Sequence, residues 1–227
     1  MDTPIVRGEP EMSPRRYASP LRKAEAARTR AAILDAAAAL FSRDGYAATT
    51  MKGIAVEAGV SVQSVHLAGS KSTLLVAAFE RTFSGAGVLD SPAQPPLIIA
   101  ALERLEVDEA ISVWLDGIAR AHERSAGLAR AMAIAAETDA VAAAALAAFD
   151  ARRHGDIRVA STWLVERGLL PAEDADEVAD ELSYLVGPET YAFLVTRSGW
   201  APSRYRAWLE RTLRDLLARR TTDVPVS

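Results

Sequence analysis

The sequence predicts an all-α protein, and three observations lead to this class. Apolar residues recur three and four positions apart along most of the chain, which is the spacing of one helix face. Alanine is abundant and aromatic residues make up only 6% of the 227 residues, a composition that favours helices over strands. No stretch alternates between apolar and polar residues as a half-buried strand does. Because 50% of the residues are hydrophobic, the chain can bury a substantial core.

Composition also excludes several kinds of chemistry. There is no cysteine, so neither disulfides nor thiolate metal sites can form. The three histidines lie far apart and have no carboxylates at ligand spacing, so we expect no metal, no cofactor and no enzymatic activity. No apolar run reaches ~18 residues and no signal peptide is evident, so a cytoplasmic protein without a membrane partner is expected.

The chain divides into four predicted parts. Residues 1–20 are rich in proline, arginine and serine and are predicted to form a flexible arm. Helical periodicity fills residues 21–83 and, after a loop rich in proline and glycine, residues 97–220. Residues 221–227 are predicted to be a flexible tail. The first helical part is small, and the second is large enough for a domain of its own.

The first part is predicted to contain four helices. A long helix runs over residues 21–43, and Gly45 can end it in a left-handed conformation. Thr50 can cap a second helix, whose apolar positions follow helical spacing until a glycine ends it. Ser61 can cap a third helix of about six residues, and Ser70 a fourth.

The second part reads as five further helical segments. The first two cover residues 108–125 and 127–139, with a predicted break between them at a glycine. An alanine-rich helix follows over residues 140–167. Residues 173–197 start with acidic residues, as a helix N-terminus prefers, and contain a Gly-Pro pair that predicts a kink. The last helix covers residues 203–220.

Two short helices of the first part have the outline of a helix-turn-helix. A helix as short as the third is stable only when its neighbours brace it, and a single helix fits the major groove of DNA. Gln63 can pair with adenine, Ser64 can donate or accept, and Val62 can meet a thymine methyl group. Lys71 and Thr50 stand at two helix starts, where phosphate groups bind well.

The distribution of charge along the chain is consistent with a DNA-binding site in the first helical part. The formal net charge of −4 by itself argues against nucleic acid. Residues 1–80, however, carry 10 Lys and Arg against 8 Asp and Glu, whereas residues 81–227 carry 16 against 22. All the lysines, Lys23, Lys52 and Lys71, lie in the first part. If any part of the chain meets phosphate groups, it is the N-terminal part.

The motif "RAAILDAAAALFSRDGYAATTMKGIAVEAGVSVQSV…SKSTLL" resembles the DNA-binding domain of the TetR (tetracycline-repressor-like) transcriptional regulators, over about residues 28–79. The resemblance implies an N-terminal three-helix helix-turn-helix DNA-binding domain and a larger C-terminal helical ligand-binding and dimerisation domain. The residues predicted to contact DNA are Thr50, Lys52, Ser61, Val62, Gln63, Ser64, His66 and Lys71. Arg28 or Arg30 can touch the DNA backbone or keep the helix soluble, and Arg15 and Arg16 can enter a minor groove or belong to a solvated tail.

The sequence departs from the family pattern after the third helix. The stretch "VHLAGSK" is one residue shorter than the usual aromatic-rich run. His66 stands where the family usually has a tyrosine that contacts phosphate, and the usual packing phenylalanine is missing. Gly53 replaces a polar residue inside the second helix, where glycine costs about 1 kcal/mol.

The resemblance also implies an effector site and a dimer. Six residues lie on helices that surround the ligand cavity in this family, although aromatic residues at helical spacing are more often core: Trp114, Ile118, His122, Met132, Trp163 and Tyr184. The last two long segments resemble the helices through which many members dimerise, and the apolar stripe along the last one predicts a partner surface. The predicted interface residues are Leu182, Val186, Tyr205, Trp208, Leu209, Leu213 and Leu216.

Two functions therefore stand side by side. The first is a ligand-responsive transcriptional regulator, expected to act as a repressor, whose homodimer binds a near-palindromic double-stranded DNA operator and a small-molecule effector. The second is a helical small-molecule-binding or enzymatic protein whose helix-turn-helix no longer binds DNA. The altered "HLAG" segment and the acidic net charge motivate this alternative.

Overall fold

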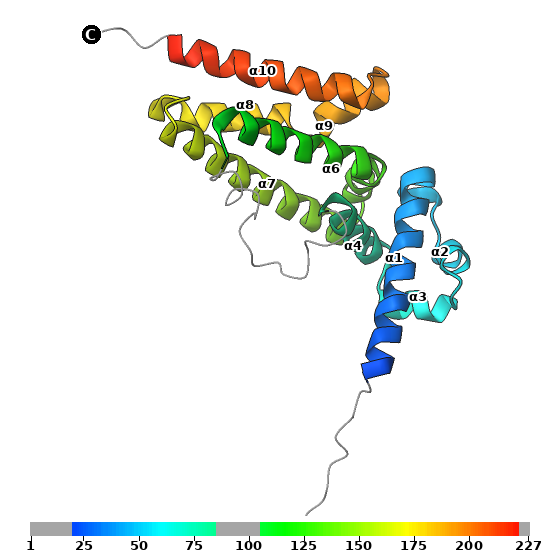
Figure 1. Cartoon of the computed structure of the whole chain (residues 1–227). Helices are drawn as coiled ribbons and strands as arrows, with labels where there is room; N and C mark the ends of the chain where they lie inside the picture. Colours follow the sequence, from blue (N-terminus) through cyan, green and yellow to red (C-terminus); the bar gives the residue numbers. More distant parts are fainter. Residues whose placement is uncertain (1–19, 85–104, 223–227) are drawn as a thin grey trace, which may run out of the picture.

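The structure, a computed structural model, describes residues 20–84 and 105–222, and every regular element in these two ranges is helical (Figure 1). This confirms the predicted all-α class. The predicted N-terminal arm with Arg15 and Arg16, the predicted loop between the two helical parts and the last residues of the predicted tail lie outside the described residues. In the two described ranges, no helix is long and apolar enough to span a bilayer.

Four helices form the N-terminal part: α1 (Pro20–Ala48), α2 (Met51–Ala58), α3 (Val62–Ala68) and α4 (Lys71–Ser84). Helix α1 is interrupted at Gly45, whose φ of 79° and ψ of 177° are not helical. The predicted end of the long helix at this glycine is therefore found, with one further turn after it. Helices α2 and α3 lie on the side of α1 that faces away from the C-terminal helices (Figure 1).

Residues 105–222 contain five further α-helices, one short 3₁₀ helix and one π-helical segment. The long ones are α6 (Val107–Ala136), α7 (Ala140–Glu166) and α10 (Pro202–Thr222). Between α7 and α10 come the 3₁₀ turn η1 (Ala172–Asp174), α8 (Ala175–Leu185), α9 (Pro188–Tyr191) and the π-helical η2 (Ala192–Arg197). The predicted kink lies between α8 and α9, where Pro188 takes the first helical position.

The predicted break in the first C-terminal helix is wrong, because α6 runs unbroken through Gly127. A Cβ atom on Gly127 would lie only 2.8 Å from Cβ and 2.9 Å from Cα of Ser42 in α1. The glycine therefore serves close packing of α6 against α1 and does not end a helix. A sequence pattern alone does not distinguish these two uses of glycine inside a helical run.

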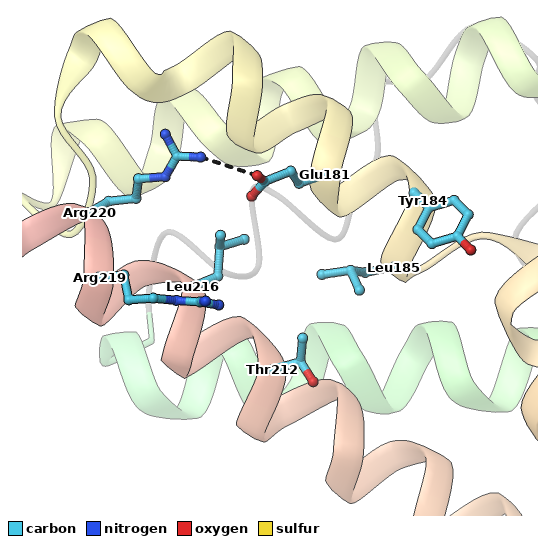
Figure 2. Close-up of a pocket in the computed structure, with 7 residues that line it drawn as sticks. All are labelled: Glu181, Tyr184, Leu185, Thr212, Leu216, Arg219 and Arg220. Atoms are coloured by element: carbon cyan, nitrogen blue, oxygen red, sulfur yellow. Dashed lines mark hydrogen bonds and ion pairs between the residues drawn. The ribbon is translucent and has the colours of Figure 1, made fainter.

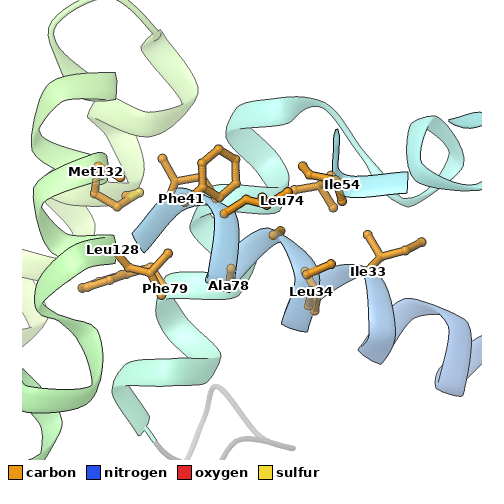
Figure 3. Close-up of a cluster of buried hydrophobic side chains, with 14 of the residues drawn as sticks. Ile33, Leu34, Phe41, Ile54, Leu74, Ala78, Phe79, Leu128 and Met132 are labelled. Carbon is orange, nitrogen blue, oxygen red and sulfur yellow. The ribbon is translucent and has the colours of Figure 1, made fainter. Parts of the chain in front are cut away.

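A first hydrophobic cluster joins the two parts of the chain (Figure 3). Phe41 of α1 and Phe79 of α4 lie in this cluster together with Leu128 and Met132 of α6. All four side chains are buried. The helix-turn-helix part therefore has no separate core. Because the shared core is closely packed, a shift of α6 would displace α1 and α4 as well.

A second cluster holds the C-terminal helices together and contains most of the residues predicted for the dimer interface. Tyr205 and Leu209 of α10 are 0% and 2% exposed, and Leu182 of α8 is 1% exposed. The apolar stripe of α10 thus packs against other helices of the same chain. Of the seven predicted interface residues, six are buried in this way: Leu182, Val186, Tyr205, Leu209, Leu213 and Leu216. Only Trp208 remains partly exposed.

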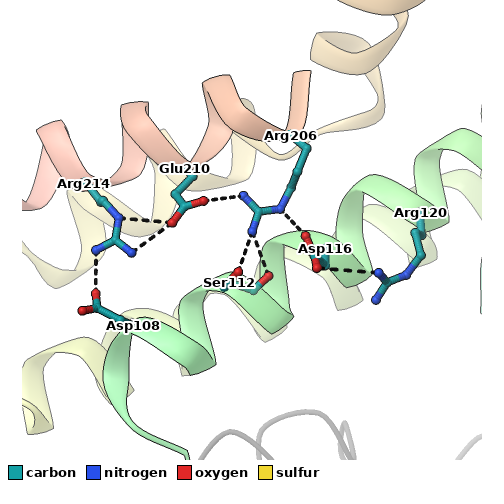
Figure 4. A network of polar contacts seen from close by, with 7 residues as sticks. All are labelled: Asp108, Ser112, Asp116, Arg120, Arg206, Glu210 and Arg214. Atoms are coloured by element: carbon teal, nitrogen blue, oxygen red, sulfur yellow. Dashed lines mark hydrogen bonds and ion pairs between the residues drawn. The ribbon is translucent and has the colours of Figure 1, made fainter. Parts of the chain in front are cut away.

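A network of charged side chains fastens α10 to α6 (Figure 4). Arg206 donates to Asp116 and, at 2.9 Å, to Glu210. Arg214 donates to Glu210 at 3.0 Å and to Asp108 at 2.6 Å. Hydrogen bonds from Arg214 and Arg206 lower the pKa of Glu210 below its usual value. The network bridges residues about 100 positions apart and fixes α10 on the second cluster.

Candidate nucleic-acid interface

The turn between α2 and α3 has the geometry of a helix-turn-helix. Gly59 ends α2 in the left-handed region, with a φ of 66°, and Ser61 begins α3. The Oγ atom of Ser61 accepts from the backbone N–H of Ser64 at 3.0 Å and lies 2.9 Å from the Oγ atom of Ser64. The predicted cap is confirmed. Both hydroxyl groups are engaged in it, which leaves them less free for base contacts.

One face of α3 is exposed to solvent. Val65 is fully buried and anchors the helix on the first cluster, with Ala68 half-buried beside it. Gln63, His66 and Leu67 are exposed. Leu67 is 82% exposed and was not among the residues predicted to contact DNA. The inward positions of Val65 and Ala68 would have placed Leu67 outward, because one residue turns the helix by about 100°.

The start of α4 lies beside this face. Ser70 caps α4, as predicted, because its Oγ atom accepts from the backbone N–H of Thr73 at 3.1 Å. The ammonium group of Lys71 lies 4.5 Å from the centroid of the Tyr46 ring and 3.4 Å from the carbonyl oxygen of Ala47. Burial lowers the pKa of Lys71. The predicted phosphate ligand thus rests against the chain, held next to a helix N-terminus.

The start of α2 carries two more predicted residues. The Oγ1 atom of Thr50 accepts from the backbone N–H of Gly53 at 3.0 Å, and Lys52 is exposed. A Cβ atom at Gly53 would lie 3.2 Å from that Oγ1 atom, tighter than most contacts of a real Cβ. The glycine that departs from the family pattern therefore leaves room for the Thr50 cap.

Arg30 of α1 positions the recognition helix α3. Its Nη1 atom donates to the carbonyl oxygen of Ala68 at 3.1 Å, where α3 ends. A guanidinium group there satisfies a carbonyl group and matches the negative end of the helix dipole. From the sequence, Arg30 was expected either to contact the DNA backbone or to keep the helix soluble. The observed hydrogen bond to Ala68 gives it a third role.

Two arginines connect the end of α4 to the C-terminal helices. Arg124 of α6 donates to the carbonyl oxygens of Thr82 and Phe83 at 3.3 and 3.0 Å. Arg152 of α7 lies 3.6 Å from a carboxylate oxygen of Glu80. Helix α4 is therefore held at its C-terminal end by the large part of the chain, while its N-terminal end lies beside the recognition helix.

The six predicted effector residues do not share one place. Trp114, Ile118 and Trp163 are half-buried against the second cluster, whereas Met132 is buried in the first. Tyr184 is 73% exposed and lines a hollow between α8 and α10.

His122 lies in the interior. Its Nε2 atom is 2.9 Å from the carbonyl oxygen of Val186 and, as the N–H tautomer, donates to it. The ring lies between those of Phe83 and Tyr191, with centroid distances of 6.1 and 5.6 Å. Burial lowers the pKa of His122, so the ring is neutral at pH 7.

Several buried polar atoms of the C-terminal helices lack a hydrogen-bond partner among the described residues. They include the hydroxyl groups of Tyr205 and Ser161 and the indole Nε1 atom of Trp163. Burial raises the pKa of the Tyr205 hydroxyl group. Buried polar atoms without partners cost free energy, and a bound molecule that pairs with them would recover it.

The outer face of α8, η2 and α10 carries two shallow hollows. The first, of about 460 Å³, lies between α8 and α10 and includes Tyr184, Leu185 and Thr212 (Figure 2). The second, of about 380 Å³, shares Tyr184 and Leu185 and adds Phe193 and Trp208. Phe193 is 58% exposed. Charged side chains also line the two hollows, Glu181, Arg219 and Arg220 in the first and Glu189 and Arg197 in the second.

Comparison with known proteins identifies the class of the N-terminal part. Residues 33–78 match the family model of bacterial regulatory proteins of the tetR family. The N-terminal helices therefore form a domain of the tetR family, as the sequence resemblance implied. No curated protein matches the chain.

Solved structures share the fold of nearly the whole chain. A proposed transcriptional regulator from Saccharomonospora viridis in complex with choline aligns with a TM-score of 0.62 and 20% identity, over 82% of this chain and 95% of that one. A proposed transcriptional regulator from Pseudomonas aeruginosa PAO1 aligns with a TM-score of 0.57 and 18% identity, over 89% and 93%. A mutant of HlyIIR aligns with a TM-score of 0.57 and 16% identity, over 80% and 97%. The chain therefore shares its overall fold with these three structures.

Proposed function

We propose that the protein is a homodimeric, ligand-responsive transcriptional regulator, acting as a repressor, that binds a near-palindromic DNA operator through α3. The observation that carries the proposal is the capped, braced and outward-facing α3 inside a tetR-family domain. Gln63 reads a base edge, and Lys71, Lys52 and the start of α4 hold phosphate groups. His66 lies on the exposed side of α3, where it can approach the DNA backbone.

Two copies pair through the outer face of α8, η2 and α10. Tyr184, Leu185 and Trp208 offer apolar surface there, and α8 and α10 lie side by side along the molecule (Figure 1). Two such helix pairs form a four-helix bundle across a two-fold axis. This pairing places two α3 helices on successive major grooves, ~34–36 Å apart.

The effector binds inside the C-terminal helices and acts through α6. Helix α6 contacts both α1 and α4, and it also contributes to the second cluster. Trp163 and Tyr205 of that cluster, and Ser161 of α7, have buried polar atoms with which an effector can form hydrogen bonds. An effector that favours one position of α6 changes the separation of the two α3 helices. A coupling of about 1–3 kcal/mol is typical of such regulators. Because a regulator of similar fold binds choline, choline is the first compound to test.

Selection of duplexes from a random pool with purified protein tests the proposal. An inverted repeat should be enriched, and its affinity should fall steeply with salt, because each phosphate contact contributes a slope of about −0.9 in log K against log salt. Gln63→Ala should relax the preference at one position by about 1–3 kcal/mol, and Lys71→Ala should weaken all sequences alike. Failure to recover any saturable duplex binding would favour the alternative, a helical ligand-binding protein with a vestigial helix-turn-helix.

A further inference from the structure

Leu67 is an apolar side chain on the exposed face of α3. It is 82% exposed, more than Val62 on the same helix at 40%. Single exposed leucines are ordinary on protein surfaces. Leu67 differs from these because of its position, which is on the helix that the proposed function places in the major groove.

Helix geometry places Leu67 next to Gln63. The two residues are four positions apart, so their side chains are neighbours on one side of the helix. Val65 and Ala68 occupy the opposite, inward side. The seven residues of α3 extend about 10 Å, which is less than the width of the major groove. Leu67 and Gln63 therefore enter the groove together when α3 does.

The edge of a base pair offers one apolar group in the major groove, the C5 methyl group of thymine. We infer that Leu67 packs against a thymine methyl group beside the base that Gln63 reads, and so specifies one thymine in each half-site of the operator. This inference rests on the proposed function and adds a specificity residue to it. The neighbours of Leu67 on α3 are polar and basic side chains, Gln63 and His66, which suit DNA better than an apolar protein partner.

Replacing single thymines by deoxyuridine in the selected duplex tests the inference. Deoxyuridine pairs like thymine and lacks only the methyl group. Wild-type protein should lose about fourfold in affinity at one thymine in each half-site, the value of burying one methyl group. Leu67→Ala should bind the thymine and deoxyuridine duplexes equally at that position, and Leu67→Met should keep part of the difference. Because Leu67 is exposed, these variants should fold as the wild type does.

A matched variant controls for the loss of an exposed aliphatic side chain elsewhere. Val159 on α7 is 48% exposed and lies in the C-terminal part, so Val159→Ala should keep the wild-type response to deoxyuridine. An equal deoxyuridine penalty in wild type and Leu67→Ala at every position would overturn the inference while leaving the proposed function intact. Enrichment of half-sites without any thymine would do the same. If no duplex binds, the proposed function fails and the inference fails with it.

Discussion

The hydroxyl group of Tyr46 donates a hydrogen bond to Oδ2 of Asp139, 3.3 Å away, and so joins the helix-turn-helix part to the start of α7. The other carboxylate oxygen, Oδ1, accepts from the backbone N–H groups of Val141 and Ala142 at 2.9 and 3.1 Å. The ammonium group of Lys71 lies over the face of the Tyr46 ring in a cation–π contact. One carboxylate thus caps α7 and supports the proposed phosphate site.

Tyr46→Phe should separate the two roles of this tyrosine. The variant keeps the ring beneath Lys71 and removes the hydroxyl group, so the free energy of unfolding should fall by about 1 kcal/mol. Asp139→Ala should be more harmful, since it also removes the cap of α7. Denaturant unfolding of both single variants and the double variant measures the coupling. If Tyr46→Phe costs as much in the Asp139→Ala background as in the wild type, the hydrogen bond does not contribute.

Two glycines inside long helices should respond in opposite directions to alanine. Gly155 of α7 has no atom within 4 Å of a built Cβ, so Gly155→Ala should stabilise the protein by about 0.5–1 kcal/mol through helix propensity. Gly127 of α6 faces Ser42 at 2.8 Å, so Gly127→Ala should cost about 1–3 kcal/mol through overpacking. Thermal unfolding of the two variants in parallel tests this contrast. Stabilisation by both substitutions would mean that α6 and α1 separate without cost.

The same glycines show what the sequence could predict. The glycine at position 45, the caps Thr50, Ser61 and Ser70, and the tetR-type motif are local signals, and the structure agrees with each of them. Gly127 looks like a break because the sequence does not show that another helix passes within contact distance. Tertiary packing of this kind overrides the local preference of a residue.

The predicted dimer residues illustrate a related physical point. An apolar stripe shows that a helix face is buried but does not show whether the covering surface belongs to the same chain. In α10 the cover is the chain's own second cluster, which contains Leu209 and Leu213. The proposed partner face has Tyr184, Phe193 and Trp208, and of these three the sequence assigned only Trp208 to the interface. Leu67 was missed because its exposure depends on how α3 is turned against α1.

Acidification should destabilise the protein through His122. Burial lowers the pKa of this buried ring in the folded state, and the neighbouring charge of Arg153 adds to the effect, whereas the Val186 carbonyl opposes it. The unfolded histidine titrates near its usual value of about 6.5. Above that pH the contribution of His122 to stability is fully present. As the pH falls below it, the unfolded state takes up the proton first and the free energy of unfolding decreases by at most about 1.4 kcal/mol per pH unit.

Two substitutions to glutamine separate His122 from other titrating groups. His122→Gln can still donate an amide hydrogen to Val186 but cannot take up a proton, so the stability of this variant should depend less on pH between about 6.5 and 5. His66→Gln, the same substitution on the exposed face of α3, is the matched control. Denaturant unfolding at several pH values measures both. Equal slopes for His122→Gln and the wild type would exclude His122 as the source.

Substitutions on the two faces of the α8–α10 pair should have distinct effects on assembly and folding. Tyr184 is 73% exposed, so Tyr184→Arg should leave the folded chain intact but place a charge in the proposed dimer interface and shift sedimentation towards the monomer. Val159→Arg, at an exposed position of α7, is the matched control and should remain dimeric. Leu209→Ala, inside the second cluster, should instead lower the free energy of unfolding by about 2–5 kcal/mol. A Tyr184→Arg protein that sediments as the wild-type dimer would place the interface on another face.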